Sequence, residues 1–257
     1  MTERLPVFFG GIALGFGLTL AGGWPFRLLA AALWLGMILE TSLAASRSLL
    51  LPFRKYLWLD LLFFGSAPIL ACAGGLPAVV LMGLAWVLVL FLIFPPDRAG
   101  LARWLFSSVV QPYIAAGVFS FFLLREIHWV WPVIALSIVV VADTAAYLIG
   151  RRLGALKLAP GISPAKTVEG AAAGIVLSSA VAAALLIRQT VPVPTSILVS
   201  LGLAILAVLG DLFESFLKRG LDIKDFGVSL PGHGGLFDRL DSLLPVSMGL
   251  FLFVKLS

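Results

Sequence analysis

One stretch near the carboxyl end of the chain concentrates side chains that could bind a metal ion and phosphate groups. Of the 18 Lys and Arg and 13 Asp and Glu residues in the chain, ten lie between residues 211 and 241, together with His233. The spacing i, i+3, i+4, i+7 would place four polar side chains on one face of a continuous helix: Asp211, Glu214, Ser215 and Lys218. This spacing predicts a helix end that presents oxygen ligands beside a cation.

Glycines follow this predicted helix and could let the backbone approach a ligand closely. The tripeptide His-Gly-Gly contains Gly234 and Gly235, and Asp238 and Asp241 lie three residues apart just beyond it. Carboxylates that gather at a site of low dielectric repel one another unless a cation neutralises them. Oxygen ligands without thiols favour Mg²⁺ over zinc. The stretch therefore predicts a Mg²⁺ site.

Four cationic side chains accompany these carboxylates: Lys218, Arg219, Lys224 and Arg239. Beside a metal ion they would attract an anion, and this combination is typical of enzymes that transfer phosphoryl-type groups. The alternative is a solvated loop at the membrane surface. In that loop Lys218 and Arg219 would interact favourably with a helix carboxyl end, and Arg239 would pair with the two aspartates.

A second anion site is predicted at residues 162–170, Ile-Ser-Pro-Ala-Lys-Thr-Val-Glu-Gly. Ser163 before Pro164 is a favourable N-cap followed by a proline at the first helical position. Lys166 would then lie in the first turn, where the helix dipole disfavours a cation unless a bound phosphate reverses the penalty. We therefore expect Ser163, Lys166 and Thr167 to bind phosphate. The alternative pairs an exposed Lys166 with Glu169.

The rest of the chain is apolar enough to be embedded in a membrane. Its residues are 61% hydrophobic and 12% charged, and its mean hydropathy is +1.10, whereas soluble proteins have about a quarter charged residues. A helix needs about 20 apolar residues to cross a bilayer. Such runs predict one all-α polytopic membrane domain, residues 1–257, with nine spans near 6–22, 28–45, 57–73, 76–95, 103–124, 130–149, 169–187, 195–217 and 243–256. The first run also resembles a signal peptide, and we interpret it as a retained helix.

Charge sets the expected orientation of these spans. The net charge of +5 comes without a basic patch interleaved with aromatic residues, so we expect no nucleic-acid partner. With nine spans, fourteen of the 18 basic residues fall on one face of the membrane, which becomes six against four when the two polar loops are left out. Excess basic charge marks the cytoplasmic side, so we expect the polar stretch to face the cytoplasm. Cys72 is the single cysteine, which excludes an intrachain disulfide.

Four carboxylates fall within or at the edges of predicted spans: Glu40, Asp60, Asp143 and Asp211. Ionisable groups at such depths are costly and usually face a cavity or a partner. We expect Glu40 and Asp60 to reach the membrane surface and pair with basic residues nearby, namely Arg47, Arg54 or Lys55. Asp143 and Asp211 are expected to line a polar cavity that opens to the cytoplasm.

The two polar stretches together resemble the phosphatidate cytidylyltransferase, or CDP-diacylglycerol synthase, family. The matching residues of the family signature are Ser215, Lys218-Arg219, Lys224-Asp225, Pro231, His233-Gly234-Gly235, Asp238-Arg239 and Asp241. The segments at 142–154, 162–170 and 210–215 are similar to the rest of its conserved half. The resemblance runs from about residue 140 to the carboxyl end, whereas residues 1–130 match only as apolar helices.

The resemblance implies a nine-helix enzyme, often dimeric, that transfers CMP from CTP to phosphatidate and releases pyrophosphate. It implies metal ligation by Asp211 and Asp238 with Asp241 beside them, and leaves room for a second cation. Phosphates would be neutralised by five basic residues: Lys166, Lys218, Arg219, Lys224 and Arg239. Ser163 and Ser215 would donate hydrogen bonds, and His233 would contact phosphate or base. Asp143 would be a further ligand or would hold Arg151. The expected location is a bacterial-type inner membrane, with the active site facing the cytoplasm.

Two other classes of protein share parts of this pattern. A CTP-using polyprenol kinase or an ether-lipid cytidylyltransferase would bind the same nucleotide, and a kinase would release CDP in place of pyrophosphate. A transporter would also carry intramembrane carboxylates and glycines, but it predicts inverted repeats, and the two halves of the sequence show no convincing pair.

Overall fold

The computed structural model describes residue 17 and residues 19–50, 57–58, 60–61, 93–94, 96–227 and 234–257. Its helices are α2 (Gly23–Ser48), α4 (Arg98–Ile127), α5 (Val130–Leu153), α6 (Val168–Arg188), α7 (Val193–Gly220), α8 (Phe237–Leu240) and α9 (Leu243–Leu256). A two-stranded antiparallel sheet of β1 (Lys157–Ala159) and β2 (Ser163–Thr167) joins α5 to α6. The described part of the chain is therefore helical apart from one short hairpin.

Five of these helices are long and apolar enough to cross a membrane: α2, α4, α5, α6 and α7. They contain the predicted spans 28–45, 103–124, 130–149, 169–187 and 195–217, and these five predictions are confirmed. The span predicted at 243–256 matches α9, which has 14 residues and is about 21 Å long at 1.5 Å per residue. The spans predicted at 6–22, 57–73 and 76–95 lie wholly or largely outside the described residues. The protein is thus an all-α integral membrane protein.

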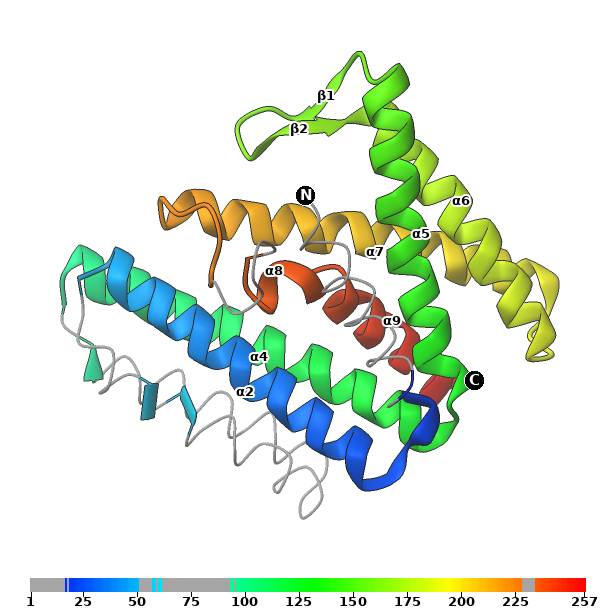
Figure 1. The fold of residues 1–257 in the computed structure, drawn as a ribbon, viewed down its shortest axis with the longest axis horizontal. Helices are drawn as coiled ribbons and strands as arrows, with labels where there is room; N and C mark the ends of the chain where they lie inside the picture. Colours follow the sequence, from blue (N-terminus) through cyan, green and yellow to red (C-terminus); the bar gives the residue numbers. More distant parts are fainter. Residues whose placement is uncertain are drawn as a thin grey trace.

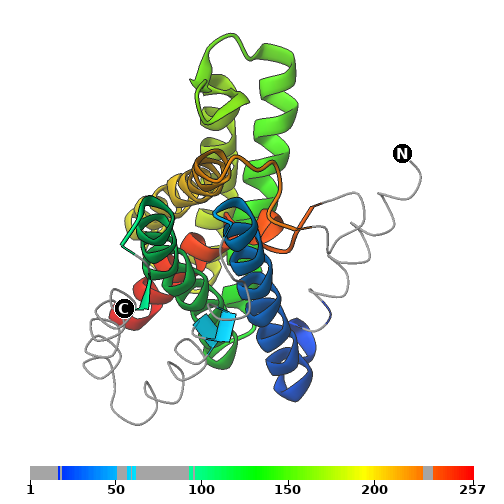
Figure 2. The same cartoon turned by 90° about the vertical axis from the view of Figure 1, so that its left-hand side faces the viewer.

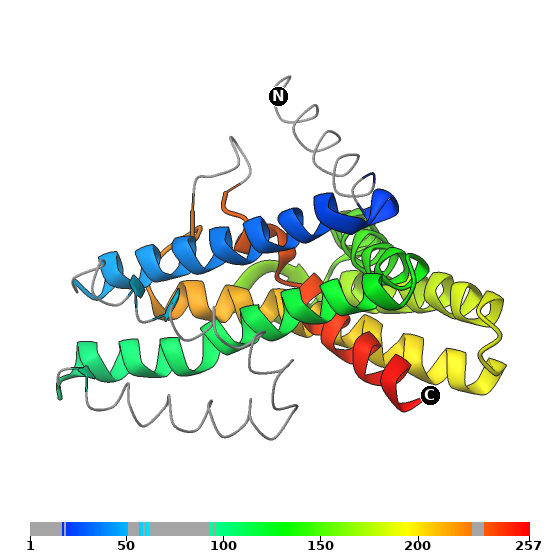
Figure 3. The same ribbon diagram turned by 90° about the horizontal axis from the view of Figure 1, so that it is seen from below.

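Helix packing divides the molecule into two parts that meet at the carboxyl-terminal helices. In one part α2 and α4 run side by side, and in the other α5, α6 and α7 pack together (Figures 1 and 3). α8 and α9 lie between the two parts, and α9 contacts α4, α5 and α7 (Figure 1). The short segment before α9 is therefore placed against helices from both halves of the sequence.

The hairpin projects from the body at the junction of α5 and α6 (Figure 2). The prediction that Ser163 caps a helix starting at Pro164 is wrong, because Ser163–Thr167 forms β2 and pairs with β1. Thr167 is the actual N-cap of α6, and its hydroxyl accepts a hydrogen bond from the Gly170 N–H at 3.2 Å. Thr167 and Ser163 are both good cap residues, and the backbone bonds of the hairpin favour the later start.

Candidate active site

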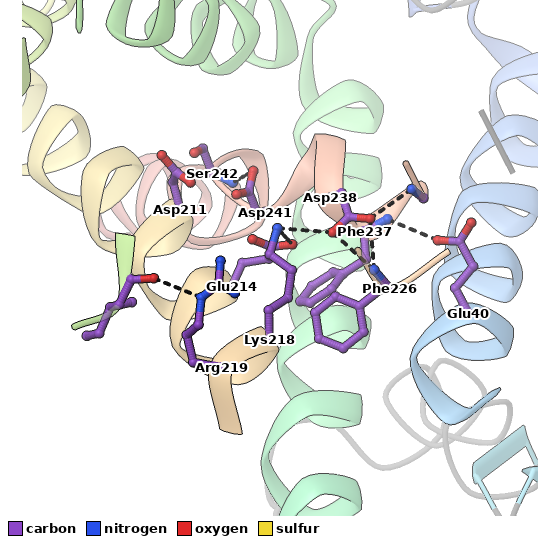
Figure 4. Close-up of polar contacts among 12 residues, drawn as sticks. Glu40, Asp211, Glu214, Lys218, Arg219, Phe226, Phe237, Asp238, Asp241 and Ser242 are labelled. Atoms are coloured by element: carbon purple, nitrogen blue, oxygen red, sulfur yellow. Dashed lines mark hydrogen bonds and ion pairs between the residues drawn. The ribbon is translucent and has the colours of Figure 1, made fainter. Parts of the chain in front are cut away.

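The last turns of α7 carry the polar face that the spacing predicted. The helix continues without interruption to Gly220, and it includes Asp211, Glu214 and Lys218. Glu214 and Ser215 are buried, whereas Asp211 is half-buried. The predicted helical face is confirmed, and its carboxylates point toward α8 and the start of α9 (Figure 4).

Three carboxylates form a compact cluster at this place. One oxygen each from Asp211, Glu214 and Asp241 lies within 4.8 Å of the others. Gly210 makes the close approach possible, because a Cβ at this position would lie 2.7 Å from the Asp241 carbonyl oxygen. The set differs from the one that the resemblance implies, since Glu214 joins Asp211 and Asp241 where Asp238 was expected. Its i+3 spacing from Asp211 had predicted that Glu214 presents its oxygens on the same helical face.

Asp241 is the member of this cluster that lies outside the long helices, between α8 and α9. Burial, and then the charge of Asp211, raise the pKa of Asp241 well above its usual range. Its Oδ1 accepts a hydrogen bond from the Ser242 N–H at 2.7 Å, which favours the charged form but does not outweigh burial. Desolvated carboxylates that repel each other are what a divalent cation with oxygen ligands would stabilise.

Asp238 lies beside this cluster and is held by the loop that precedes it. Its carboxylate accepts hydrogen bonds from the Gly235 N–H at 2.8 Å, the Phe226 N–H at 3.0 Å and the Lys218 ammonium at 3.2 Å. Burial raises the pKa of Asp238, but hydrogen bonds from Glu214, Gly235 and Lys218 outweigh burial and lower the pKa below its usual range. Asp238 is therefore a stable anion within hydrogen-bonding reach of Glu214.

Two lysines reach the carboxylates from different elements. Lys166, on β2, forms an ion pair with Asp211 at 2.5 Å, and Lys218 forms one with Glu214 at 2.6 Å. Glu169 instead accepts hydrogen bonds from the Leu156 N–H, so the alternative pairing of Lys166 with Glu169 is wrong. The hairpin thus places Lys166, from the second predicted anion site, next to Asp211 of the first.

A cavity of about 500 Å³ opens next to Asp211, between α5, the hairpin, α6 and α7. Its lining includes Asp143, Lys166 and Thr167, which were predicted to bind substrate. Arg151 also lines the cavity and donates a hydrogen bond to the Tyr147 hydroxyl at 3.0 Å. The described hydrogen bond of Arg151 goes to Tyr147, which disfavours the alternative in which Asp143 holds Arg151. That Asp143 is a further metal ligand stays a prediction.

The other predicted residues are distributed around this centre. Arg219 donates to the Ile162 carbonyl at 3.2 Å and so ties the hairpin turn to α7, next to Ser163. Lys224 and Arg239 are exposed. Gly234 adopts a positive φ of 82°, which favours glycine. His233 lies outside the described residues.

Two carboxylates of the first half of the chain have partners that the sequence did not predict. Asp60 is 1% exposed and binds the buried Arg103 at 2.7 Å, so its predicted pairing at the membrane surface is wrong. Glu40 is 8% exposed and accepts a hydrogen bond from the Leu236 N–H at 2.7 Å, so its predicted pairing is wrong as well. A buried carboxylate needs a hydrogen-bonding or charged partner. The partner of Asp60 is Arg103 and that of Glu40 is the backbone of Leu236, both distant in the sequence.

Comparison with known proteins gives a consistent result over the chain. The model of the "Cytidylyltransferase family" matches residues 2–257. The phosphatidate cytidylyltransferase of Brucella suis is 35% identical over 243 residues, which cover 92% of this chain and 86% of that protein. Those of Bacillus subtilis and Staphylococcus haemolyticus are 47% and 34% identical over 116 and 168 residues. The matched segments span 44% and 64% of this chain, and 43% and 64% of those two relatives.

Proposed function

We infer that this chain, which belongs to the cytidylyltransferase family, transfers CMP from CTP to phosphatidate and forms CDP-diacylglycerol and pyrophosphate. The observation that carries this proposal is the cluster of Asp211, Glu214 and Asp241, with two lysines at its edge and a cavity of about 500 Å³ beside it. Relatives that are similar over most of this chain are named phosphatidate cytidylyltransferases.

Mg²⁺ is the cofactor that suits the residues of the cluster. The donors are carboxylate oxygens within 4.8 Å of one another, and burial, followed by the charge of Asp211, raises the pKa of Asp241. We propose that the ion is held by Asp211, Glu214 and Asp241. Asp238 lies within hydrogen-bonding reach of Glu214, and we propose that its carboxylate contributes an oxygen ligand to a second cation. A bound Mg²⁺ would supply neutralising charge for phosphate oxygens.

The side chains of the site have defined tasks in this reaction. A phosphate oxygen of phosphatidate attacks the α-phosphorus of CTP, a new P–O bond forms, the bond from the α-phosphorus to the bridging oxygen breaks, and pyrophosphate leaves. The acceptor is itself a phosphate, so the protein supplies no nucleophile. Lys166 and Lys218 neutralise the triphosphate and the lipid phosphate, as do the exposed Lys224 and Arg239 when substrate is bound.

The remaining predicted contacts concern hydrogen bonds and the nucleotide. Ser163 and Ser215 donate to phosphate oxygens, Gly234 and Gly235 let the backbone approach them, and Asp143 and Thr167 line the cavity that takes the substrate. His233 contacts phosphate or the cytosine base. Arg219 acts mainly on the hairpin, since it donates to the Ile162 carbonyl.

We further propose nine spans in a bacterial inner membrane, with the site facing the cytoplasm. CTP is a water-soluble polyanion whereas the acyl chains of phosphatidate stay in the bilayer, so the site needs access from both. The excess of basic residues on the face that contains the polar loops supports this orientation. The resemblance also implies a homodimer, which a mass measurement of the protein in detergent tests.

The products distinguish this function from its rivals. Purified protein with CTP, labelled phosphatidate and Mg²⁺ is expected to form labelled CDP-diacylglycerol and equal amounts of pyrophosphate, and Asp238→Asn is expected to lose this activity. Release of CDP would indicate a lipid kinase instead. Formation of a CDP-lipid only with an ether-linked acceptor would indicate the other cytidylyltransferase.

A further inference from the structure

Glu40 connects the first half of the chain to the loop that carries the predicted site residues. It lies on α2, in the part of the sequence where the resemblance offers no motif. Its Oε2 accepts hydrogen bonds from the Leu236 N–H at 2.7 Å and from the Phe237 N–H at 3.3 Å (Figure 4). The Glu40 side chain is thus bound to the backbone at the start of α8, 196 residues away in sequence.

The two described ends of the loop between α7 and α8, residues 221–227 and 234–236, approach this carboxylate closely. A Cβ at Gly227 would lie 2.7 Å from Oε1 of Glu40, and a Cβ at Gly235 would lie 2.5 Å from Oε2. Gly36, one turn before Glu40 on α2, leaves room for Leu236, whose Cδ1 would lie 2.5 Å from a Cβ there. Both described ends of the loop therefore pack closely against one face of α2, and glycines make this packing possible.

The same backbone segments hold Asp238. The Gly235 N–H donates to Asp238 at 2.8 Å and the Phe226 N–H donates at 3.0 Å, so residues adjacent to those that touch Glu40 bind the aspartate. Asp241 follows one turn later, and its carbonyl accepts a hydrogen bond from the Tyr113 hydroxyl of α4 at 3.2 Å. A shift of the loop relative to α2 would move both aspartates relative to α7.

We propose that Glu40 is a positioning residue of the cytidylyl transfer. Its carboxylate holds the loop and the start of α8 in the register that brings Asp238 and Asp241 to Glu214 and Asp211. The side chain itself touches neither substrate nor the reacting atoms. This inference rests on the proposed function, and it assigns to α2 a task in catalysis beyond anchoring the protein in the membrane.

Substitutions of Glu40 in the full-length protein in detergent test the inference. Glu40→Ala removes both accepted hydrogen bonds and is expected to lower kcat about 10–100-fold, the usual effect of losing a residue that orients metal ligands. Glu40→Gln keeps a carbonyl acceptor of the same length and is expected to lose less, about 3–10-fold, because hydrogen bonds to a charged acceptor are stronger. Glu40→Asp is one methylene shorter and is expected to resemble Glu40→Ala.

Three readouts separate positioning from a merely structural role. KM for CTP and for phosphatidate should change less than kcat, because Glu40 does not touch them. The Mg²⁺ concentration that gives half-maximal rate should rise in Glu40→Ala, since the ligands lose their register. The melting temperature should show that each assayed variant is folded. Glu126→Gln, which changes an exposed ion pair with Arg27, is the matched control and should behave as wild type.

Gly227→Ala approaches the same contact from the loop side. Its new methyl group would press on the Glu40 carboxylate, so it is expected to lower kcat in wild type and to have much less effect in Glu40→Ala, where the space is free.

An inactive wild type would count against the proposed function itself. An active wild type with Glu40→Gln and Glu40→Ala within twofold of it would overturn the inference, as would a rise in KM for CTP at unchanged kcat. Should Glu40→Ala fail to fold, Glu40→Gln and Gly227→Ala decide.

Discussion

Two buried clusters of charged side chains in this protein differ in how their charge is balanced. Around Asp60, the carboxylate binds Arg103 at 2.7 Å and the Ser42 hydroxyl at 2.6 Å, and Gln111 completes the group. Asp60 and Arg103 are at most 1% exposed. At the end of α7, by contrast, three carboxylates lie within 4.8 Å of one another, with lysines only at the edge.

We interpret the cluster of Asp60 as structural and propose that the cluster of Asp211 is functional. The cluster of Asp60 pairs one carboxylate with one guanidinium and encloses them, so it has no charge to offer a ligand. The cluster of Asp211 concentrates negative charge beside a cavity, which costs stability and is typical of sites that bind a cation or a substrate. Burial of a carboxylate alone therefore does not indicate an active site, whereas a local excess of one charge beside a cavity makes a cluster a candidate.

The largest effect is expected from breaking the balanced cluster. Arg103→Met leaves Asp60 buried without its cation, and this should lower the free energy of unfolding by about 3–5 kcal/mol. Asp60→Leu combined with Arg103→Met should regain most of the loss, because apolar residues can replace a buried pair. Unfolding in detergent measures the free energy of both variants. The control is Arg27→Met, which removes an exposed ion pair and is expected to lower the free energy of unfolding by about 0–1 kcal/mol. Equal losses in the single and double variants would contradict the account.

Substitution in the unbalanced cluster should have the opposite signature. Asp241→Asn is expected to lower kcat/KM by about 10²–10³-fold, comparable to losing a group that stabilises charge in the transition state. Its melting temperature should not fall, since a desolvated carboxylate that repels Asp211 is removed. Steady-state rates and thermal unfolding measure the two effects. A variant that is both active and unstable would place Asp241 with the structural cluster.

Removal of the lysine from the hairpin should affect substrate binding. Lys166→Met deletes the ion pair with Asp211 and a positive charge that lines the cavity. Hydrogen bonds to charged groups contribute about 1.5–3 kcal/mol, so we expect kcat/KM to fall by about 10–150-fold, with KM for CTP carrying much of the change. Lys157→Met, on β1 of the same hairpin, is the control. An unchanged KM would contradict the assignment of Lys166 to phosphate.

The pH dependence of stability should show the smallest effect. The pKa of Asp241 is raised in the folded state, so this residue favours folding when protonated, and that contribution is lost as pH rises through the raised pKa. As pH rises from the unfolded pKa of about 4 to the raised value, wild type loses stability and Asp241→Asn does not. The free energy of unfolding of Asp241→Asn should therefore increase relative to that of wild type by at most about 1.4 kcal/mol per pH unit. Melting temperatures with a chelator present measure this, and parallel pH profiles would contradict it.

The pattern along the sequence was sufficient for the part of the site that lies on one helix. The i, i+3, i+7 spacing of Asp211, Glu214 and Lys218 predicted a shared face, and α7 confirms it. Apolar runs likewise predicted five described spans. Both inferences depend only on nearby residues: the shared face follows from helical spacing, and the spans follow from the length of apolar runs.

Contacts between distant segments could not be predicted in this way. Glu40 binds Leu236, and Asp60 binds Arg103, through packing of helices that no spacing rule relates. At the hairpin, Ser163 and Thr167 are both competent N-caps, and pairing with β1 decided between them. Arg103 is the first residue of the predicted span 103–124, and an ionisable side chain at the edge of a span was nevertheless a signal that an acidic partner was near.

We propose that the cluster of Asp211, Glu214 and Asp241 binds a divalent metal ion, and binding of Mn²⁺ as a probe for Mg²⁺ tests this proposal. Paramagnetic resonance on the chelator-treated full-length protein would count bound Mn²⁺ in wild type, Glu214→Gln and the control Glu126→Gln. We expect wild type and control to bind Mn²⁺ and Mg²⁺ to displace it. The affinity for Mn²⁺ should be at least about tenfold lower in Glu214→Gln, and wild type should form CDP-diacylglycerol only with Mg²⁺ present. Equal binding by all three proteins, or none by an active wild type, would contradict it.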